Sequence, residues 1–150
     1  MLLIVLFGCS GSGDIATSER NGEKERVRVV DGNQAAQIIN GMHNQSVAAD
    51  TNVIAEYGRE KKDLLYISYY ADQMQAKNAF DLMIEKMAAA KKGPFFHLMP
   101  LNTYTKPVYF TLGMGSRHYI YQSGNYLLWL QTYQAFDDKL PPRLLKLYPV

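Results

Sequence analysis

The feature that most constrains the fold is a series of three apolar segments near the C-terminus, separated by short turn sequences. Residues 108–112, 118–122 and 126–133 are rich in aromatic and aliphatic side chains and have the length of strands. The intervening residues 113–116 and 123–125 contain Gly, Ser and Asn, which tolerate the backbone angles of tight turns. Strands joined by such short turns run antiparallel. The sequence therefore predicts a three-stranded C-terminal meander.

Further strands are predicted in the first two thirds of the chain. Residues 53–57 and 64–70 form a predicted hairpin that is closed by the charged turn at residues 58–63. Residues 26–30 are a predicted short strand, and residues 95–101 are a strand candidate that Pro100 interrupts. Most of the predicted strands are therefore neighbours in an antiparallel sheet.

One long helix is predicted at about residues 73–91, with Asp72 as its N-cap. Its apolar side chains recur every three or four residues, as on the buried face of an amphipathic helix; they are Ala76, Ala79, Phe80, Met83, Ile84 and Met87. Short helices are predicted at residues 32–40, where Asp31 is a candidate N-cap, and at residues 142–147.

These elements predict an α+β fold. Its antiparallel sheet is built of hairpins and a C-terminal meander, and it is packed by the long amphipathic helix at about residues 73–91 and by one or two short helices. The 150 residues suit a single domain, and a hydrophobic content of 47% is enough to form a core. The single cysteine excludes an intramolecular disulfide.

The N-terminus is an apolar segment that ends at this cysteine. Residues 2–7 are all apolar, and Gly8 and Cys9 follow them. The segment at residues 6–9 resembles the lipobox of bacterial lipoproteins, in which the peptide before the cysteine is removed and the cysteine is acylated. The resemblance implies that residues 1–8 are a signal-peptide remnant, that Cys9 carries lipid, and that the membrane is a partner. It also implies an outer-membrane location facing the periplasm, because Ser10 follows the cysteine.

A polar segment separates Cys9 from the predicted domain. Residues 10–25 are rich in Gly, Ser and alternating charges and have few apolar side chains, so they are too polar to fold alone. The predicted organisation is therefore an acylated cysteine and flexible tether at residues 9–25, followed by one α+β domain at residues 26–150.

The sequence argues against two classes of partner. An apolar strand followed by the glycine-rich residues 8–13 is also how a nucleotide-binding P-loop begins, but that motif continues with Lys and then Ser or Thr. Here Asp14 and Ile15 occupy those positions, and a carboxylate repels phosphate. The net charge of +2 gives no indication of nucleic acid as a partner.

A metal or haem site is one hypothesis for the domain. His97 and Met99 would share one face of a regular strand, and Met114 and His118 flank a predicted turn. Imidazole and thioether together suit copper or haem iron. The alternative is that these residues only pack in the fold. Covalent c-type haem is excluded because no Cys-x-x-Cys-His motif occurs.

The aromatic side chains of the predicted meander are candidates for a binding surface. The chain has 11 Tyr against 6 Phe and 1 Trp, and tyrosine is common both in sheets and at interaction surfaces. The candidate surface consists of Tyr109, Tyr119, Tyr121, Tyr126 and Trp129. Because residues 126–130 are apolar on both faces of their strand, either both faces are covered or Trp129 faces a partner.

These observations favour a non-enzymatic binding or docking protein of the cell envelope, with another envelope protein or a small apolar ligand as its partner. The alternatives are a periplasmic metal- or haem-binding redox accessory and an enzyme of unrecognised type. No catalytic residues are identified: Glu56 is the carboxylate best placed to face inward, but such a residue more often lies on the solvated face of a sheet.

Overall fold

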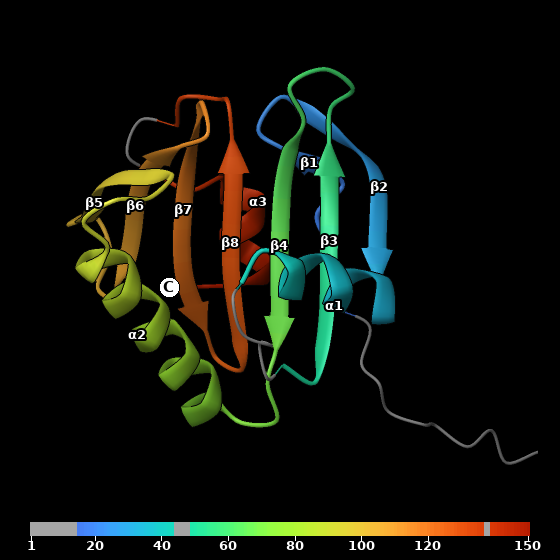
Figure 1. The fold of residues 1–150 in the computed structure, drawn as a ribbon. Coiled ribbons are helices and arrows are strands. Elements are labelled where there is room, and N and C mark those ends of the chain that lie inside the picture. The colour runs from blue at the N-terminus through green and yellow to red at the C-terminus, as the bar shows by residue number, and fades with distance from the viewer. Residues whose placement is uncertain (1–14, 44–48, 137–138) are drawn as a thin grey trace, which may run out of the picture.

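The computed structural model describes residues 15–43, 49–136 and 139–150 (Figure 1). Within these ranges the chain forms one eight-stranded antiparallel sheet with the strand order β1-β2-β3-β4-β8-β7-β6-β5. The strands are β1 (Arg20–Asn21), β2 (Lys24–Asp31), β3 (Thr51–Tyr57), β4 (Asp63–Tyr69), β5 (Phe95–Pro100), β6 (Val108–Gly113), β7 (Ser116–Ser123) and β8 (Tyr126–Thr132). The helices are α1 (Gly32–Gly41), α2 (Gln73–Ala89) and α3 (Pro142–Leu147).

The predicted fold class is wrong in its organisation. The hairpin β3–β4 and the meander β6–β7–β8 occur, but they belong to one continuous sheet that dominates the described residues. They are joined by β4 and β8, whose pairing runs from Leu64 opposite Gln131 to Tyr69 opposite Tyr126. The helix α2 does not pack the whole sheet, because only Ala76 and Phe80 of its apolar stripe are fully buried.

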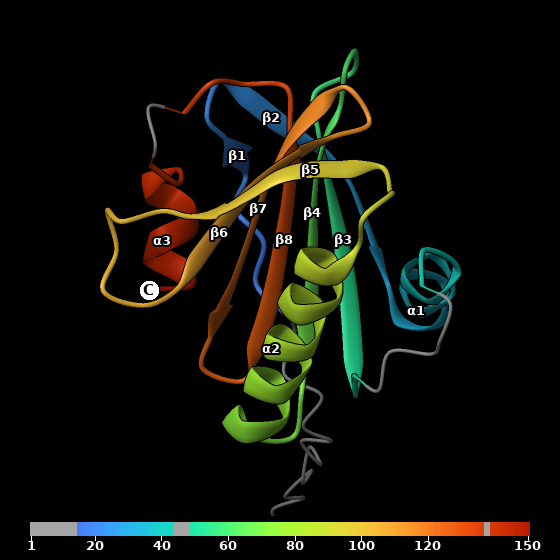
Figure 2. The ribbon, with the colours of Figure 1, turned by 60° about the vertical axis from the view of Figure 1, so that its left-hand side comes forward.

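The helices cover the two faces of the sheet unequally. Figures 1 and 2 together show α1 and α2 on one face and α3 on the opposite face. The largest group of buried residues lies on the α3 side and includes Tyr57, Tyr121 and Leu128 of the sheet with Leu144 of α3. A second group lies beneath α2 and a third beneath α1. Strand β8 is therefore covered on both faces, with Leu128 in the first group and Leu127 in the second.

The described fold begins before the domain boundary predicted near Arg26. Residues 15–25 are not a free tether: Ile15 packs against the α3-side core, and Ser18 and Asn21 are buried. The phenol of Tyr57 donates a hydrogen bond to the Ser18 carbonyl oxygen at 3.0 Å, and the Asn21 side-chain amide donates one to the Asp63 carboxylate at 2.9 Å. Hydrogen bonding of polar groups, which hydrophobic periodicity does not detect, holds this segment on the sheet.

The predicted lipidation site, Cys9, lies outside the described residues, as do the predicted signal-peptide remnant and the first part of the tether. In the part of the chain that the structure describes, no helix combines the length and the apolar character needed to span a bilayer.

Candidate functional site

The predicted tyrosine surface does not exist as an exposed face. Tyr119 and Tyr121 retain only 3% and 0% of their accessible surface, because they point into the core on the α3 side. Tyr109 is half-buried under α2, where its ring lies 6.0 Å from that of Phe80. Tyr126 packs edge-on against Tyr148 at 5.0 Å. The sheet therefore uses these tyrosine rings for internal packing, and they do not form an open docking surface.

Trp129 and His118 form a partly buried polar contact beside Phe95, at the start of β5. The indole Nε1 of Trp129 donates to Nδ1 of His118 at 2.9 Å, and the other ring nitrogen of His118 lies 3.0 Å from the Gly113 carbonyl oxygen and from Ser116 Oγ. The Phe95 ring closes the cluster, 5.0 Å from the imidazole. Burial lowers the pKa of His118, and the hydrogen bond to Gly113 partly opposes this effect.

The structure does not support the predicted His/Met ligand set. Both nitrogens of His118 are occupied by protein partners, so neither is free for a metal ion. In β5 the register shifts between Phe96, opposite Leu112, and Met99, opposite Phe110. His97 sits in this bulge with φ 58°, so the alternation that would place it on one face with Met99 is broken.

The remaining candidates give no metal or catalytic centre in the described part of the chain. Met114 is exposed in the turn between β6 and β7, at a positive φ. Within the described ranges no group of three or more His, Cys, Asp or Glu side chains is placed to hold a metal ion. Glu56 is largely buried, but its carboxylate pairs with Lys62 at 2.8 Å and with Arg28 at 3.6 Å.

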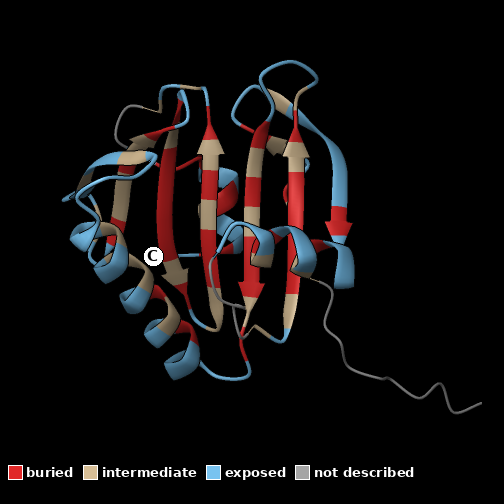
Figure 3. Ribbon diagram, viewed as in Figure 1, coloured by how far each residue is buried: buried red, intermediate tan, exposed pale blue. Residues whose placement is uncertain are grey.

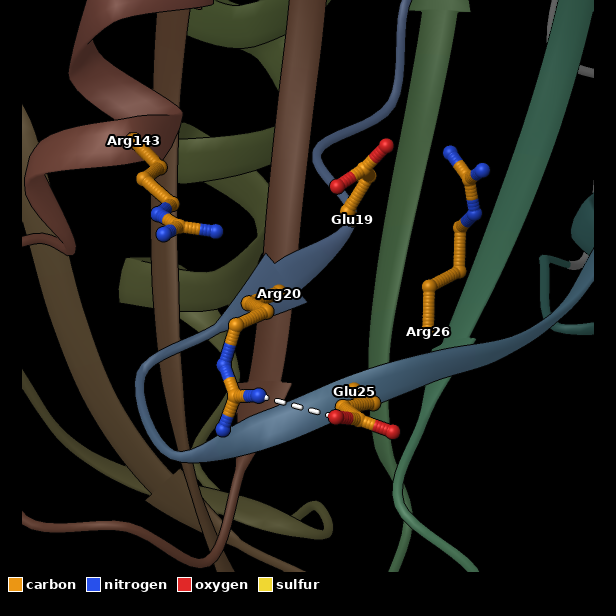
Figure 4. Close-up of a pocket in the computed structure, with 5 residues that line it drawn as sticks. All are labelled: Glu19, Arg20, Glu25, Arg26 and Arg143. Carbon is orange, nitrogen blue, oxygen red and sulfur yellow. Dashed lines mark hydrogen bonds and ion pairs between the residues drawn. The ribbon is translucent and has the colours of Figure 1, made fainter.

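A charged hollow lies where β1, β2 and α3 meet. It has a volume of about 500 Å³. We call it the arginine hollow, and its lining residues are Glu19, Arg20, Glu25, Arg26 and Arg143. Figure 4 shows Arg143 reaching from α3 towards β1, while Glu19 and Arg26 extend side by side on the other flank. Arg20 pairs with Glu25 at 3.0 Å. A second hollow, of about 450 Å³, is lined by Lys24, Glu60, Lys61, Tyr133 and Gln134. Neither lining suits a small apolar ligand.

The outer edge of β2 is the other exposed feature. The short strand β1 covers β2 only at its start, and the contact ends where the Arg26 amide donates to the Glu19 carbonyl oxygen at 2.8 Å. Beyond this point, no strand of the described chain pairs with the outer side of residues 27–31, which we call the β2 edge. Val27 and Val29 are each 44% exposed there, and Figure 3 shows most of β2 as exposed.

Neither feature was predicted from the sequence. Arg20 and Arg26 lie close together in the sequence, on β1 and β2, but Arg143 comes from α3 near the other end of the described chain, so no local motif marks the hollow. The β2 edge depends on the order of strands in the sheet, which local patterns do not determine. No protein-family model, curated protein or solved structure matches the chain, so the site must be interpreted from its geometry and chemistry.

Proposed function

We propose that this protein is a non-enzymatic docking protein of the cell envelope, held on the membrane by an acylated Cys9, and that it binds an extended segment of another envelope protein along the β2 edge. The observation that carries the docking function is the open edge at residues 27–31. The envelope location rests on the resemblance of residues 6–9 to a lipobox.

An open strand edge offers unpaired backbone donors and acceptors to another chain, so most sheets protect their edges. The opposite edge of this sheet is protected, because β5 is short, bulged and ends at Pro100. In β2 the register shift lies between Arg26 and Arg28, near β1, and pairing with β3 is regular from there to Asp31. An added strand would gain backbone hydrogen bonds and contacts with Val27 and Val29.

The charges beside this edge define the chemistry of the partner. Arg26 and Arg28 are exposed next to the two valines, and Arg28 shares the Glu56 carboxylate with Lys62. An extended segment that combines acidic with small apolar side chains complements this arrangement. We therefore expect such a segment in the partner.

The membrane anchor is tested by the mass of the mature N-terminal peptide. The natural gene, with its upstream codons, is expressed in a diderm bacterium, and protein is recovered from the membrane fraction. The proposal expects a diacylglycerol-modified Cys9 as the first residue. An unmodified chain that still starts at Met1 would contradict the envelope location and leave the β2 edge to be tested by itself.

Docking is tested by placing a photo-crosslinking residue at Val29 in cells. We expect one crosslinked species at this position, lost when Val27→Lys adds a charge to the edge. The matched control is the same residue at Met74 of α2, which is also exposed but lies on a helix away from β2. No crosslinked species at Val29, or the same species at both positions, would refute docking at this edge.

A further inference from the structure

We propose that the arginine hollow is a binding site for a phosphate group, with Arg143 as its principal ligand and Arg20 and Arg26 beside it. The phosphate could belong to a phospholipid headgroup of the anchoring membrane or to free phosphate. Only the headgroup source rests on the proposed membrane anchor.

The charges in the hollow are incompletely balanced. Its lining contains three guanidinium groups and two carboxylates. The ion pair between Arg20 and Glu25, at 3.0 Å, neutralises one of each. Arg26 donates to the carbonyl oxygen and hydroxyl of Thr17 at 2.9 and 2.6 Å, and these neutral acceptors leave its charge uncompensated. Two arginines therefore face one remaining carboxylate, that of Glu19.

Arg143 is the residue with unused binding capacity. It is exposed on α3, and within the described part of the chain it makes no hydrogen bond or ion pair. The planar guanidinium has five N–H donors and matches the geometry of phosphate oxygens better than an ammonium group does. An anion in the hollow would satisfy these donors with charge-assisted hydrogen bonds.

The neighbouring arginines are held in place before any ligand binds. Arg20 is fixed by Glu25 and by the carbonyl oxygen of Glu23, and Arg26 is fixed by Thr17. Side chains that are already ordered lose less conformational entropy on binding, so more of the interaction energy appears as affinity. Glu19 acts in the opposite direction, because its negative charge repels the anion.

The position of the hollow favours a headgroup as the source. Glu19 follows Cys9 by ten residues, and an extended chain of this length reaches at most about 35 Å. A lipid on Cys9 would therefore hold the hollow close to the headgroups. At the high effective concentration that a short tether creates, even weak phosphate binding would orient the domain on the membrane.

The test uses the full chain with Cys9→Ser, which cannot be acylated, so that its outcome does not depend on the anchor. Inorganic phosphate is titrated while the side-chain Nε–Hε signals of the arginines are followed by NMR. Binding is also measured by co-sedimentation with vesicles of phosphatidylglycerol and phosphatidylcholine, and with vesicles of phosphatidylcholine alone. We expect saturable shifts of the Arg143, Arg20 and Arg26 signals.

Three variants test the assignment, because one should weaken phosphate binding, one should strengthen it and one should leave it unchanged. Arg143→Gln should weaken binding about tenfold, because it removes charge-assisted hydrogen bonds. Glu19→Gln should strengthen binding about two- to fivefold, because it removes a like charge. Lys92→Gln removes one positive charge just after the end of α2, a helix on the opposite face of the sheet from α3, and should leave affinity within about twofold. Thermal unfolding confirms that each variant is folded.

The outcomes are distinct. Phosphate and anionic vesicles that both bind and both respond to Arg143→Gln support the site with a headgroup ligand, whereas a response to phosphate alone supports free phosphate. Absence of saturable arginine shifts overturns the proposal, and so does an equal loss in the Arg143 and Lys92 variants. A chain that binds phosphate but is never acylated in cells would support the phosphate site and contradict the membrane anchor.

Discussion

Trp129 donates a hydrogen bond from its indole nitrogen to Nδ1 of His118 at 2.9 Å, across the neighbouring strands β8 and β7. Indole nitrogen is only a donor, so Nδ1 of the imidazole must be the acceptor and carry no proton. The proton of neutral His118 is therefore on Nε2, which lies 3.0 Å from the Gly113 carbonyl oxygen. This contact defines both the tautomer and the neutral charge state of a buried histidine.

The first prediction is that acid destabilises the fold through His118. Because burial lowers the pKa of His118 in the folded chain, the unfolded chain takes up a proton at a higher pH than the folded chain does. This contribution to stability is complete above about pH 6.5 and is lost as the pH falls from there towards the lowered pKa. Urea unfolding at a series of pH values measures the loss, and His118→Phe should make stability less dependent on pH in this window.

The same variant has an expected cost at neutral pH. His118→Phe leaves the Trp129 indole N–H and the Gly113 carbonyl without this partner, which should lower the free energy of unfolding by about 1–3 kcal/mol. His97→Gln, at an exposed position in β5, is the control and should retain the acid sensitivity of the wild type. An unchanged pH dependence in His118→Phe would contradict the prediction.

The second prediction concerns Asp63, a fully buried carboxylate at the start of β4. It forms an ion pair with Lys24 at 2.8 Å. It also accepts hydrogen bonds from four further groups, namely the side chains of Asn21, Thr132 and Gln134 and the backbone amide of Tyr133. Asp63→Ala should destabilise the fold by about 3–5 kcal/mol, because it leaves the largely buried ammonium of Lys24 without its counter-charge and several donors without this acceptor.

The control for this prediction is Asp81→Ala. Asp81 pairs with Lys77 on the exposed surface of α2, and such pairs contribute about 0.5 kcal/mol or less. Chemical denaturation of the two variants therefore separates a buried carboxylate with many partners from a surface ion pair. A similar cost for both substitutions would show that Asp63 does not hold β1, β2, β4 and β8 together.

The third prediction is that the stable domain begins before Arg26. The reference is a chain that starts at Ile15, the first residue that the structure describes. A chain that starts at Arg26 lacks the Ser18 carbonyl that Tyr57 contacts and the Asn21 and Lys24 side chains that contact Asp63. Loss of these contacts should lower the melting temperature by about 10 °C or more, as measured by circular dichroism. Equal melting temperatures of the chains that start at Ile15 and at Arg26 would support the predicted tether instead.

Residues 15–25, which precede the domain start predicted at Arg26, show how much the sequence could indicate about the fold. Apolar periodicity predicted the position of α2, and the Asp72 side chain caps it as expected, accepting from the Gln75 amide at 2.8 Å. Residues 15–25 carry almost no apolar period, and buried hydrogen bonds to partners far along the chain hold them in place. Composition alone therefore predicted a tether where the structure has part of the sheet.

Pairing between strands that are distant in the sequence also limited the prediction of the site. Tight turns indicate which strands are neighbours in a hairpin, but the pairing of β4 with β8 connects segments with most of the chain between them. That pairing makes the sheet continuous, leaves β2 at one edge and covers Tyr121 under α3. The tyrosines were candidates both for internal packing and for an exposed face, because the sequence does not indicate which sheet face α3 covers.

The last prediction is that alkali destabilises the fold through Tyr57. Burial raises the pKa of its phenol to about 12, an effect that the nearby Arg26 partly opposes. The folded chain therefore keeps the proton at a pH where the unfolded chain, with a tyrosine pKa of about 10, has lost it. This stabilisation is complete below about pH 10, and up to about 2–3 kcal/mol of it is lost as the pH rises through 12.

Absorbance of ionised tyrosine during an alkaline titration, combined with urea unfolding, measures the effect. Tyr57→Phe should reduce the alkaline loss, whereas Tyr133→Phe, at an exposed ring, should not. Ionisation of all tyrosines near pH 10, before any unfolding, would show that the Tyr57 phenol is not held in the core.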